Sequence, residues 1–349
     1  MSDKKRTIGF GIVGTGSISD FHARAIDLVP DAKLISVFSR RSPEGFAEKF
    51  GVEADRELET MLKRPEIEAI CVTTPSGAHE EIVIPALEAG KHVLCEKPLE
   101  VSLDRIDRMV ALAEEKGLIF AAVFQSRFGP AVQTIKKAVE EGRFGRITLV
   151  GCHIKWWRSQ EYYDEGGWRG TWKLDGGGAL MNQGIHTVDL LQYLLGMPEE
   201  LHARTGTLAH ERIEVEDAAV ANFVMPGGAL GILEAGTSAW PGFARRIEIS
   251  GDRGSAILED GTLKFWQFQD ETEEDEKIRE AQKATSGIGG GSSDPKAISV
   301  EGHRLQIQDL VDAIREQREV VVPAREARNA VKFILSIYES ARTGKSVRL

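Results

Sequence analysis

Four polar side chains occupy one side of the segment GGGALMNQGIHTVDLLQYLLG. With residues set about 100° apart around a helix over 179–195, Asn182, His186, Asp189 and Tyr193 fall within one narrow wedge, and leucines lie opposite. A solvated face would normally carry Lys and Glu, whereas this face carries hydrogen-bonding groups and an imidazole that titrates near neutrality. The pattern indicates proton exchange with a bound substrate, and a hydrogen-bonded structural histidine is the alternative.

A glycine-rich turn follows the first apolar run of the chain and precedes a helical pattern. Gly14 permits the tight turn, Gly16 lets the backbone approach a pyrophosphate, and a helix N-terminus offers N–H groups to phosphates. Ser19 replaces the third glycine of the usual fingerprint. The turn predicts a dinucleotide site, with a tight loop that binds no ligand as the alternative. The predicted phosphate-binding residues are Gly14, Thr15, Gly16, Ser17 and Ile18.

The end of the second apolar run indicates which nucleotide is bound. An acidic residue there would bind the ribose hydroxyls and repel a 2'-phosphate. This chain has Ser39, Arg40 and Arg41 instead, and two guanidiniums with a hydroxyl can hold a 2'-phosphate. The sequence therefore favours NADP over NAD. The alternative is that Arg40 stacks on adenine while Arg41 is solvated.

Strand and helix patterns alternate through the first hundred residues, which indicates βαβ units and a parallel sheet. After about Phe128 the pattern changes to strands with little helix between them, joined by turn signals at 226–228 and 260–261. The segment 270–295 is acidic and then rich in Gly and Ser, which predicts a solvated loop, or alternatively a lid. The expected strands of the first part are TIGFGIV, AKLISVFSR, AICVTTP, KHVLCEKP and LIFAAVFQSRF.

Composition restricts the class of protein. A chain of 349 residues with 42% hydrophobic residues predicts two domains. The net charge of -10, without a dense basic cluster, argues against nucleic-acid and anionic membrane partners and favours small molecules. Three cysteines without C-x-x-C spacing predict neither a metal site nor a disulfide framework, and a cytoplasmic location is expected. No segment has the apolar length of a membrane span.

Several ordered motifs make the chain resemble the glucose-fructose oxidoreductase, inositol dehydrogenase and rhizopine catabolism (Gfo/Idh/MocA) family. The resemblance covers nearly the whole chain and does not identify the substrate. The motifs are the glycine turn, TTPSGAH at 73–79, EKP at 96–98, FQSRF at 124–128, GGWRGTW at 166–172, the His186 segment and the C-terminal YESARTGKSVRL.

The resemblance implies an α/β Rossmann domain over residues 1–127 and an α+β domain with an open, mostly antiparallel sheet over 128–349. Two amphipathic C-terminal segments are expected to be helices that pack back on the first domain. The implied activity is hydride transfer between NAD or NADP and a sugar, polyol or nucleotide sugar. A homodimer or homotetramer through the antiparallel sheet is expected.

The resemblance also places a catalytic His at position 186 and an Asp or Asn at position 182. Asn182 cannot exchange a proton near neutral pH, and a similar Asn occurs in a branch that resembles nucleotide-sugar-acid 3-dehydrogenases. We expect a hydride to leave a secondary alcohol while His186 accepts the hydroxyl proton and Lys97 holds the oxygen. The reverse assignment stays open, although a lysine base needs its pKa lowered from about 10.4.

Further contacts are expected around these two catalytic residues. Aromatic rings stack on sugar faces, and Arg side chains bind carboxylate or phosphate. The predicted substrate-binding residues are Asn182, Asp189, Arg127, Trp168, Arg169 and Trp172, and Asp189 alternatively orients the imidazole. The further predicted cofactor-binding residues are Thr74, Pro75, His79, Glu96, Lys97 and Gln125.

Two other activities are compatible with the same family resemblance. One is a glycosidase that uses bound NAD for a transient oxidation, and the other is a non-enzymatic sensor of sugar or cofactor. A pure sensor needs no Lys97 and His186, and both residues are present. The sequence therefore favours an NAD(P)-dependent dehydrogenase.

Overall fold

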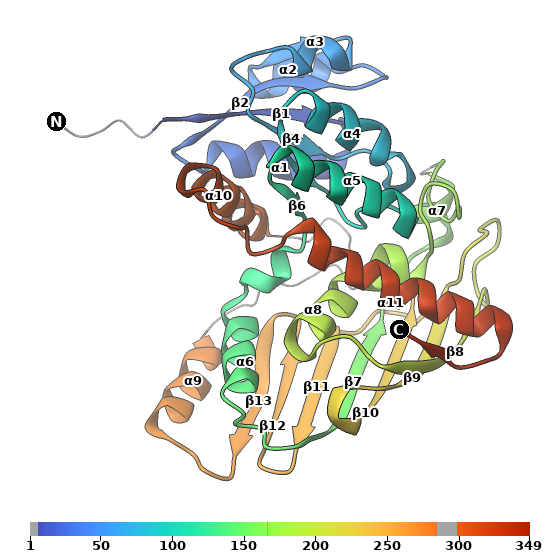
Figure 1. The fold of residues 1–349 in the computed structure, drawn as a ribbon. Helices are drawn as coiled ribbons and strands as arrows, with labels where there is room; N and C mark the ends of the chain where they lie inside the picture. The colour runs from blue at the N-terminus through green and yellow to red at the C-terminus, as the bar shows by residue number, and fades with distance from the viewer. Residues whose placement is uncertain (1–5, 166, 285–298) are drawn as a thin grey trace. The chain divides into compact units, whose positions relative to one another are not determined.

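The computed structural model describes residues 6–165, 167–284 and 299–349, which form two compact units (Figure 1). The first unit contains the chain up to residue 125 together with residues 300–328. The second contains residues 126–299 and 329–349. The chain therefore returns to the first unit through α10 Val300–Glu316, and α11 Ala324–Thr343 begins in the first unit and ends in the second.

The first unit is built on a six-stranded sheet in the order β3-β2-β1-β4-β5-β6. All of its strand pairs are parallel, as the βαβ pattern predicts. The strands are β1 Ile8–Val13, β2 Ala32–Phe38, β3 Glu53–Asp55, β4 Ala69–Val72, β5 His92–Cys95 and β6 Phe120–Ala122. The helices are α1 Ser17–Asp27, α2 Glu44–Phe50, α3 Leu58–Leu62, α4 Glu80–Glu88 and α5 Leu103–Lys116, with a short 3-10 turn η1 at Ser76–Ala78.

Helix α10 supplies part of the core of this unit although it lies about two hundred residues beyond the sheet in the chain. Its buried side chains Ile307, Leu310 and Val311 recur at helical spacing and join the same apolar cluster as Phe10 of β1 and Ile26 of α1. Burying such a stripe is the main source of stability for an amphipathic helix. The C-terminal segment therefore completes the first unit.

The last strand of this sheet is shorter than the sequence pattern predicts. The pattern favours a strand from about 118 to 128, but β6 ends at Ala122 and a 3-10 turn, η2, occupies Gln125–Phe128. The neighbouring strand β5 ends at Cys95, whose carbonyl accepts a last ladder bond from the N–H of Val123. Beyond this bond the apolar chain has no strand to pair with, so it turns.

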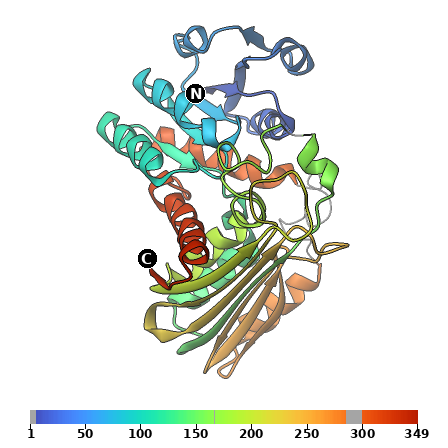
Figure 2. The same ribbon diagram turned by 90° about the vertical axis from the view of Figure 1, so that its right-hand side faces the viewer.

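The second unit is built on an eight-stranded sheet in the order β13-β12-β11-β7-β10-β9-β8-β14 (Figure 2). Only β7 and β10 run parallel, so the sheet is mostly antiparallel and the predicted fold class is confirmed. The strands are β7 Ile147–Lys155, β8 Glu200–Gly206, β9 Ala218–Val224, β10 Leu230–Gly236, β11 Arg246–Gly251, β12 Gly254–Glu259, β13 Thr262–Phe268 and β14 Val347–Arg348.

Helices cover one face of this sheet. Helix α8 packs on β7 and β11, and α6 packs on β12. Both predicted hairpin turns are confirmed: η4 Pro226–Gly228 joins β9 to β10, and Asp260 and Gly261, with φ of 45° and 80°, join β12 to β13. The helices are α6 Pro130–Glu140, α7 Gln160–Asp164, α8 Ile185–Leu195 and α9 Glu273–Ala284, with a π-turn η3 at Ala179–Gly184.

Helix α9 corrects the prediction of a loop over 270–295. Its residue Asp275 receives two hydrogen bonds from Arg143, at 2.7 and 2.8 Å, and one from the indole N–H of Trp266 at 2.8 Å. The Arg143 guanidinium holds the pKa of Asp275 well below its ordinary value. These bonds fix the first turn of α9. Its acidic composition is typical of a solvated loop, which is why the sequence predicted a loop there. The rest of the predicted loop, 285–295, lies outside the described residues.

In the ranges that the structure describes, every helix is too short or too polar to cross a bilayer.

Candidate functional site

The glycine turn at the end of β1 has the geometry that a phosphate-binding loop requires. Gly14 has a φ of +116°, and a Cβ there would lie 2.6 Å from Thr73 Oγ1. Gly16 precedes α1, and a Cβ built on it would meet no atom within 4 Å, so its backbone is open to a ligand. Ser19, at the third glycine position, is fully buried and its hydroxyl lies 2.8 Å from Thr73 Oγ1. A hydrogen bond thus replaces the close glycine packing.

The residues predicted to contact the ribose of the adenosine lie beside this turn. The hydroxyl of Thr15 donates to Ser39 Oγ at 3.3 Å, and the backbone N–H of Arg41 also lies 3.3 Å from that oxygen. Arg40 forms an exposed ion pair with Glu81 of α4 at 2.8 Å. This carboxylate offsets the positive charge of Arg40, on which the prediction of NADP depends.

Two predicted cofactor contacts carry buried polar atoms that require a partner. Thr74 Oγ1 and Gln125 Oε1 are buried, and neither has a hydrogen-bond partner among the described residues. Leaving such atoms unpaired costs free energy. The carboxamide and ribose hydroxyls of a nicotinamide nucleotide can make the missing bonds, so these residues fit that cofactor.

His79 and Pro75 shape the loop that presents Thr74. His79 is fully buried, and its ring nitrogens lie 2.9 Å from the carbonyl oxygen of Thr74 and 3.1 Å from that of Leu99. Burial lowers the pKa of His79, although these carbonyls partly oppose the shift. Pro75 precedes η1, so the chain turns directly after Thr74. This geometry makes His79 a link between two loops, and its direct contact with a cofactor stays a prediction.

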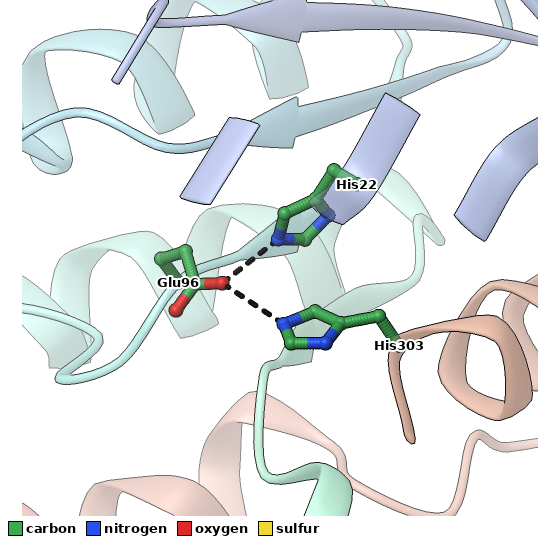
Figure 3. Close-up of side chains that lie close together, drawn as sticks. All are labelled: His22, Glu96 and His303. Atoms are coloured by element: carbon green, nitrogen blue, oxygen red, sulfur yellow. Dashed lines mark hydrogen bonds and ion pairs between the residues drawn. The ribbon is translucent and has the colours of Figure 1, made fainter. Parts of the chain in front are cut away.

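Glu96 and Lys97 directly follow β5, and the Glu96 carboxylate is nearly buried, with 6% of the residue exposed. Its Oε1 atom lies 2.8 Å from His22 Nε2, and its Oε2 atom accepts the backbone N–H of Lys97 at 3.1 Å. His303 of α10 also faces Oε1 (Figure 3). Burial raises the pKa of Glu96, but its contacts with the two histidines outweigh this effect and hold that pKa well below 4.5. The carboxylate is therefore ionised.

The sequence pattern predicts one α-helix for the segment that carries Asn182 and His186. The structure instead divides this segment into two elements. Residues Ala179–Gly184 form the π-turn η3, in which the N–H of Gln183 bonds to the carbonyl of Gly178, five residues earlier, at 3.3 Å. Such turns occur frequently at functional sites. The wedge prediction holds for His186, Asp189 and Tyr193, which lie within α8, but not for Asn182 in the wider turn.

Glu216 causes this departure from α-helical geometry. Its carboxylate accepts the backbone N–H of Gly178 at 3.0 Å and that of Leu180 at 2.8 Å, and it also accepts the hydroxyl of Tyr338 at 2.9 Å. Burial raises the pKa of Glu216, and these donors partly oppose the rise. An acid from a distant loop thereby satisfies amides that a regular helix leaves open.

Asn182 belongs to a hydrogen-bond network within the second unit. Its amide nitrogen donates to the fully buried carboxylate of Asp175 at 2.5 Å, and its oxygen accepts from Gln183 at 3.2 Å. Gln183 in turn accepts two bonds from Arg158, at 3.1 and 2.7 Å, and donates to Tyr162 at 2.8 Å. The orientation of the Asn182 amide is therefore determined by its neighbours.

Arg127 and Asp189, both predicted to contact substrate, bind each other instead. Two hydrogen bonds of 2.9 and 2.7 Å join the guanidinium to the carboxylate, and both residues are fully buried. The ring of Tyr193 lies 4.6 Å from the guanidinium carbon, a favourable cation–π distance. This geometry argues against direct substrate contact and favours a role in holding α8.

The loop before η3 that contains Trp168, Arg169 and Trp172, here called the aromatic loop, leaves all three side chains at least partly exposed. The guanidinium of Arg169 lies over the ring of Tyr162 at 4.4 Å and near that of Trp168 at 5.6 Å. Trp172 is 45% exposed, and its ring packs edge-on against Tyr338 at 5.3 Å. Substrate contacts by Trp168, Arg169 and Trp172 stay predictions, and the exposed indole of Trp172 is compatible with stacking on a sugar.

Lys97 and His186 belong to different units, and both are partly exposed. Sequence reasoning missed several residues that support them. The three glycines that directly follow Asp175 are a signal that could have drawn attention to it, but nothing local distinguished Arg158, Glu216, His22 or His303 from ordinary polar residues. Their partners lie between 25 and 207 positions away in the chain, so only the fold identifies them.

Comparison with known families identifies the class of this protein. Residues 8–124 match the family described as "Oxidoreductase family, NAD-binding Rossmann fold", and residues 132–257 match the "GFO/IDH/MocA C-terminal domain". The chain therefore belongs to the Gfo/Idh/MocA family of NAD(P)-dependent oxidoreductases, which confirms the resemblance inferred from its motifs.

Known relatives have several activities. The solved structure of the WlbA dehydrogenase from Bordetella pertussis, in complex with NADH and UDP-GlcNAcA, is 34% identical with a TM-score of 0.88, covering 99% of this chain and 98% of that one. The scyllo-inositol 2-dehydrogenase (NADP(+)) IolW of Bacillus subtilis (strain 168) is 27% identical over 99% of this chain and 97% of its own length. A 2,7-anhydro-N-acetylneuraminate hydratase from Mediterraneibacter gnavus is 29% identical over 78% and 76%.

Breaking the Arg127–Asp189 pair is expected to destabilise the protein strongly. Asp189→Asn leaves a buried guanidinium without its counter-charge, and we expect a loss of about 3–5 kcal/mol in the free energy of unfolding. Urea denaturation followed by circular dichroism measures this loss. The matched control is Asp164→Asn in the exposed pair with Arg212, which should cost below about 1 kcal/mol. An equal cost for both variants would contradict the buried-charge argument.

Proposed function

We propose that this protein is a dehydrogenase that transfers a hydride from a secondary alcohol of a nucleotide-linked sugar acid to a nicotinamide cofactor. The observation that carries the hydride-transfer part lies in the first unit: the backbone at Gly16 is open, and Thr74 Oγ1 and Gln125 Oε1 are buried without a hydrogen-bond partner among the described residues. Those groups suit a pyrophosphate and a nicotinamide nucleotide, respectively.

The proposed mechanism assigns a role to each catalytic side chain. The bound nicotinamide supplies the hydride acceptor. His186 accepts the hydroxyl proton of the substrate, since an imidazole exchanges protons near neutral pH without a large change of its pKa. Lys97 donates a hydrogen bond to the same oxygen and stabilises the negative charge that develops on it. The alcohol thereby loses one hydride and one proton and becomes a ketone.

The substrate class follows from Asn182 and from the WlbA dehydrogenase. Held by Asp175 and Gln183, the Asn182 amide cannot take a proton, and a primary amide is a group that hydrogen-bonds sugar oxygens without exchanging protons with them. The WlbA dehydrogenase structure contains UDP-GlcNAcA and resembles this chain over almost its full length. Arg169, partly exposed among aromatic rings, is suited to bind the acid group of such a sugar.

A redox-neutral reaction is the second candidate. The hydratase relative supports it, and a glycosidase using transient oxidation shares the first step, removal of a hydride. In that case the ketone stays bound and the hydride returns to product. Such an enzyme would convert its substrate without net formation of reduced nicotinamide, which separates it from the dehydrogenase.

The proposal predicts reduction of the cofactor by a specific class of sugar. On mixing the protein with NAD or NADP and a panel of nucleotide sugar acids, neutral nucleotide sugars, inositols and aldoses, absorbance of reduced nicotinamide should rise with nucleotide sugar acids. Lys97→Ala and His186→Ala should each lower turnover by about 10²- to 10⁴-fold, and cofactor affinity should stay nearly unchanged in His186→Ala, whose side chain is not a predicted cofactor contact. Lys33→Ala and His202→Ala are matched controls of the same residue types.

Several outcomes would contradict this assignment. Turnover by His186→Ala at the wild-type rate would exclude the imidazole from the reaction. Substrate conversion detected by mass spectrometry without a change in absorbance would favour the redox-neutral reaction. Binding of nucleotide with no conversion of any sugar would favour a sensor.

We propose that the cofactor is NAD, although the residue types at 39–41 favour NADP. Arg40 lies opposite Glu81, and a carboxylate near a 2'-phosphate is unfavourable. The structure of the WlbA dehydrogenase, which is 34% identical to this chain, contains NADH. The scyllo-inositol 2-dehydrogenase whose name includes NADP(+) is less similar to this chain, at 27% identity.

Removal of the Glu81 charge should shift this preference. Glu81→Gln frees Arg40 to face a 2'-phosphate, and because an exposed ion pair contributes below about 1 kcal/mol, we expect kcat/KM with NADP relative to NAD to rise roughly two- to fivefold. The matched control is Glu80→Gln, whose partners Arg105 and Arg108 lie on α5. A wild-type enzyme that already prefers NADP would overturn the proposal.

We also propose that the open face of the eight-stranded sheet forms a subunit interface in a homodimer or homotetramer. Leu149, Val220, Leu230 and Ile232 point away from the helices and are 55–59% exposed. They lie on the adjacent strands β7, β9 and β10, and Leu149 directly neighbours Leu230 in the register. A patch of this kind typically marks a protein–protein contact.

A charge placed on this face should dissociate the oligomer. Ile232→Lys would bury an unpaired charge in the interface, so light scattering coupled to size exclusion should show a lower molecular mass than for the wild type. Leu208→Lys is the matched control, since Leu208 is 79% exposed in a loop after β8. A monomeric wild-type protein would contradict the interface.

A further inference from the structure

The buried cluster of His22, Glu96 and His303 joins three segments of the first unit that are distant in sequence (Figure 3). His22 lies in α1, the helix that begins at the phosphate-binding turn; Glu96 follows β5; and His303 lies in α10. All three residues are buried, with 0%, 6% and 2% of their surfaces exposed. A charged group in such a place requires a structural or functional explanation.

Each oxygen of the Glu96 carboxylate has a separate partner. Oε1 lies 2.8 Å from His22 Nε2, while Oε2 accepts the backbone N–H of Lys97 at 3.1 Å. Burial lowers the pKa of His22, and the hydrogen bond and charge of Glu96 only partly offset this. A neutral His22 that donates its Nε2 proton to an ionised Glu96 is therefore the arrangement consistent with both groups.

His303 makes the weaker contact. Its Nε2 lies 3.6 Å from Glu96 Oε1, longer than a hydrogen bond, and neither of its ring nitrogens has a hydrogen-bond partner among the described residues. Its ring packs edge-on against His22, with centroids 5.1 Å apart, and lies near Phe21 at 5.9 Å. The two histidines are therefore unequal: His22 holds the carboxylate, and His303 closes the space around it.

Two histidines and one carboxylate also form a common set of metal ligands, and their ligand atoms lie within 4.8 Å of one another. Histidines that bind a metal usually donate their second ring N–H to another group. Here the Nδ1 atoms of His22 and His303 are both buried and lack a hydrogen-bond partner among the described residues. This absence, together with the 2.8 Å bond between His22 and Glu96, favours a hydrogen-bond network over a metal centre.

We propose that this cluster is a positioning network for Lys97: His22 orients the Glu96 carboxylate so that its other oxygen holds the Lys97 backbone in the position needed for hydride transfer. Because His22 belongs to the helix that follows the phosphate loop, the network also connects the Lys97 loop to the cofactor loop. Glu96 and His22 are thus positioning residues rather than catalytic ones. This inference rests on the proposed role of Lys97.

The test compares His22→Leu, which removes the donor, with His22→Gln, whose amide N–H can reach the place of the imidazole Nε2–H. His22→Leu should lower kcat by roughly 10- to 100-fold, as expected for a displaced reacting group, with KM for the sugar nearly unchanged. His22→Gln should retain most of the activity. His303→Leu should have a smaller effect than His22→Leu.

The control is His92→Leu, a part-buried histidine of β5 whose Nδ1 accepts the N–H of Ile119 at 3.0 Å. It should leave kcat unchanged while lowering the thermal midpoint, which separates positioning from simple destabilisation. If His22→Leu does not fold, His22→Asn replaces it, since its amide is too short to reach Glu96.

A second readout does not depend on turnover. Hydrogen–deuterium exchange of the peptide 95–99, in which Pro98 has no amide hydrogen, reports on the Lys97 N–H. Exchange in that peptide should become at least about tenfold faster in His22→Leu and stay unchanged in His22→Gln and His92→Leu. If no sugar is turned over, this readout still tests the network, so failure of the proposed function and failure of the network are distinguishable.

Three results would overturn the proposal. One is a His22→Leu protein with wild-type kcat and wild-type exchange at peptide 95–99. Another is equal loss of activity in His22→Leu and His22→Gln, which would show that the donor is not what matters. The third is about one equivalent of zinc or another transition metal per chain by elemental analysis, lost in His22→Gln, which would identify a metal site.

Discussion

Burial of acidic side chains is the constraint on which the candidate site depends. Removing a carboxylate from water is costly unless charge or hydrogen bonds replace the lost hydration. Each buried acid in this protein therefore draws donors toward itself and determines the conformation of the segment that supplies them. The acids concerned are Glu96, Asp175, Asp189 and Glu216, each with under 9% of its surface exposed.

The kind of donor decides what each acid does. Asp189 is neutralised by the full charge of Arg127, which fixes α8 as a rigid support. Glu216 instead receives backbone amides of Gly178 and Leu180, so it shapes the π-turn rather than adding an ion pair. A wider turn moves Asn182 off the helical wedge that includes His186. Neutral donors thus change backbone geometry, and a charged donor stabilises geometry that is already helical.

Local patterns predicted most of the fold because the signals involved are local. The alternating strands and helices, the glycine stop after α5 and the paired positive-φ residues at Asp260 and Gly261 all depend on nearby residues. The failures share a different cause. The π-turn depends on Glu216, α9 depends on Arg143, and the end of β6 depends on the length of β5. Each is decided by a partner outside the segment itself.

The same distinction applies to the candidate site. Residue type and motif were sufficient to point to the glycine turn, Lys97 and His186. They could not distinguish residues that contact a ligand from residues that support the structure around it. Arg127 and Asp189 have the chemistry of substrate-binding residues, and only their mutual hydrogen bonds reveal that each already has a partner. His22 has no motif of its own, since its relation to Glu96 spans 74 positions.

These assignments limit where substrate specificity can arise. Arg127 and Asp189 are fully buried against each other, whereas Arg169, which stacks on Tyr162, and Trp172 are partly exposed in the aromatic loop. The described residues of that loop, 167–172, belong to no strand or helix, so its exposed side chains can change without altering the Arg127–Asp189 pair that fixes α8. The relatives of this chain include proteins named as dehydrogenases and one named as a hydratase, so the family scaffold accommodates more than one substrate. Under the proposed function, the buried pairs support hydride transfer, and exposed residues such as Arg169 and Trp172 select the sugar.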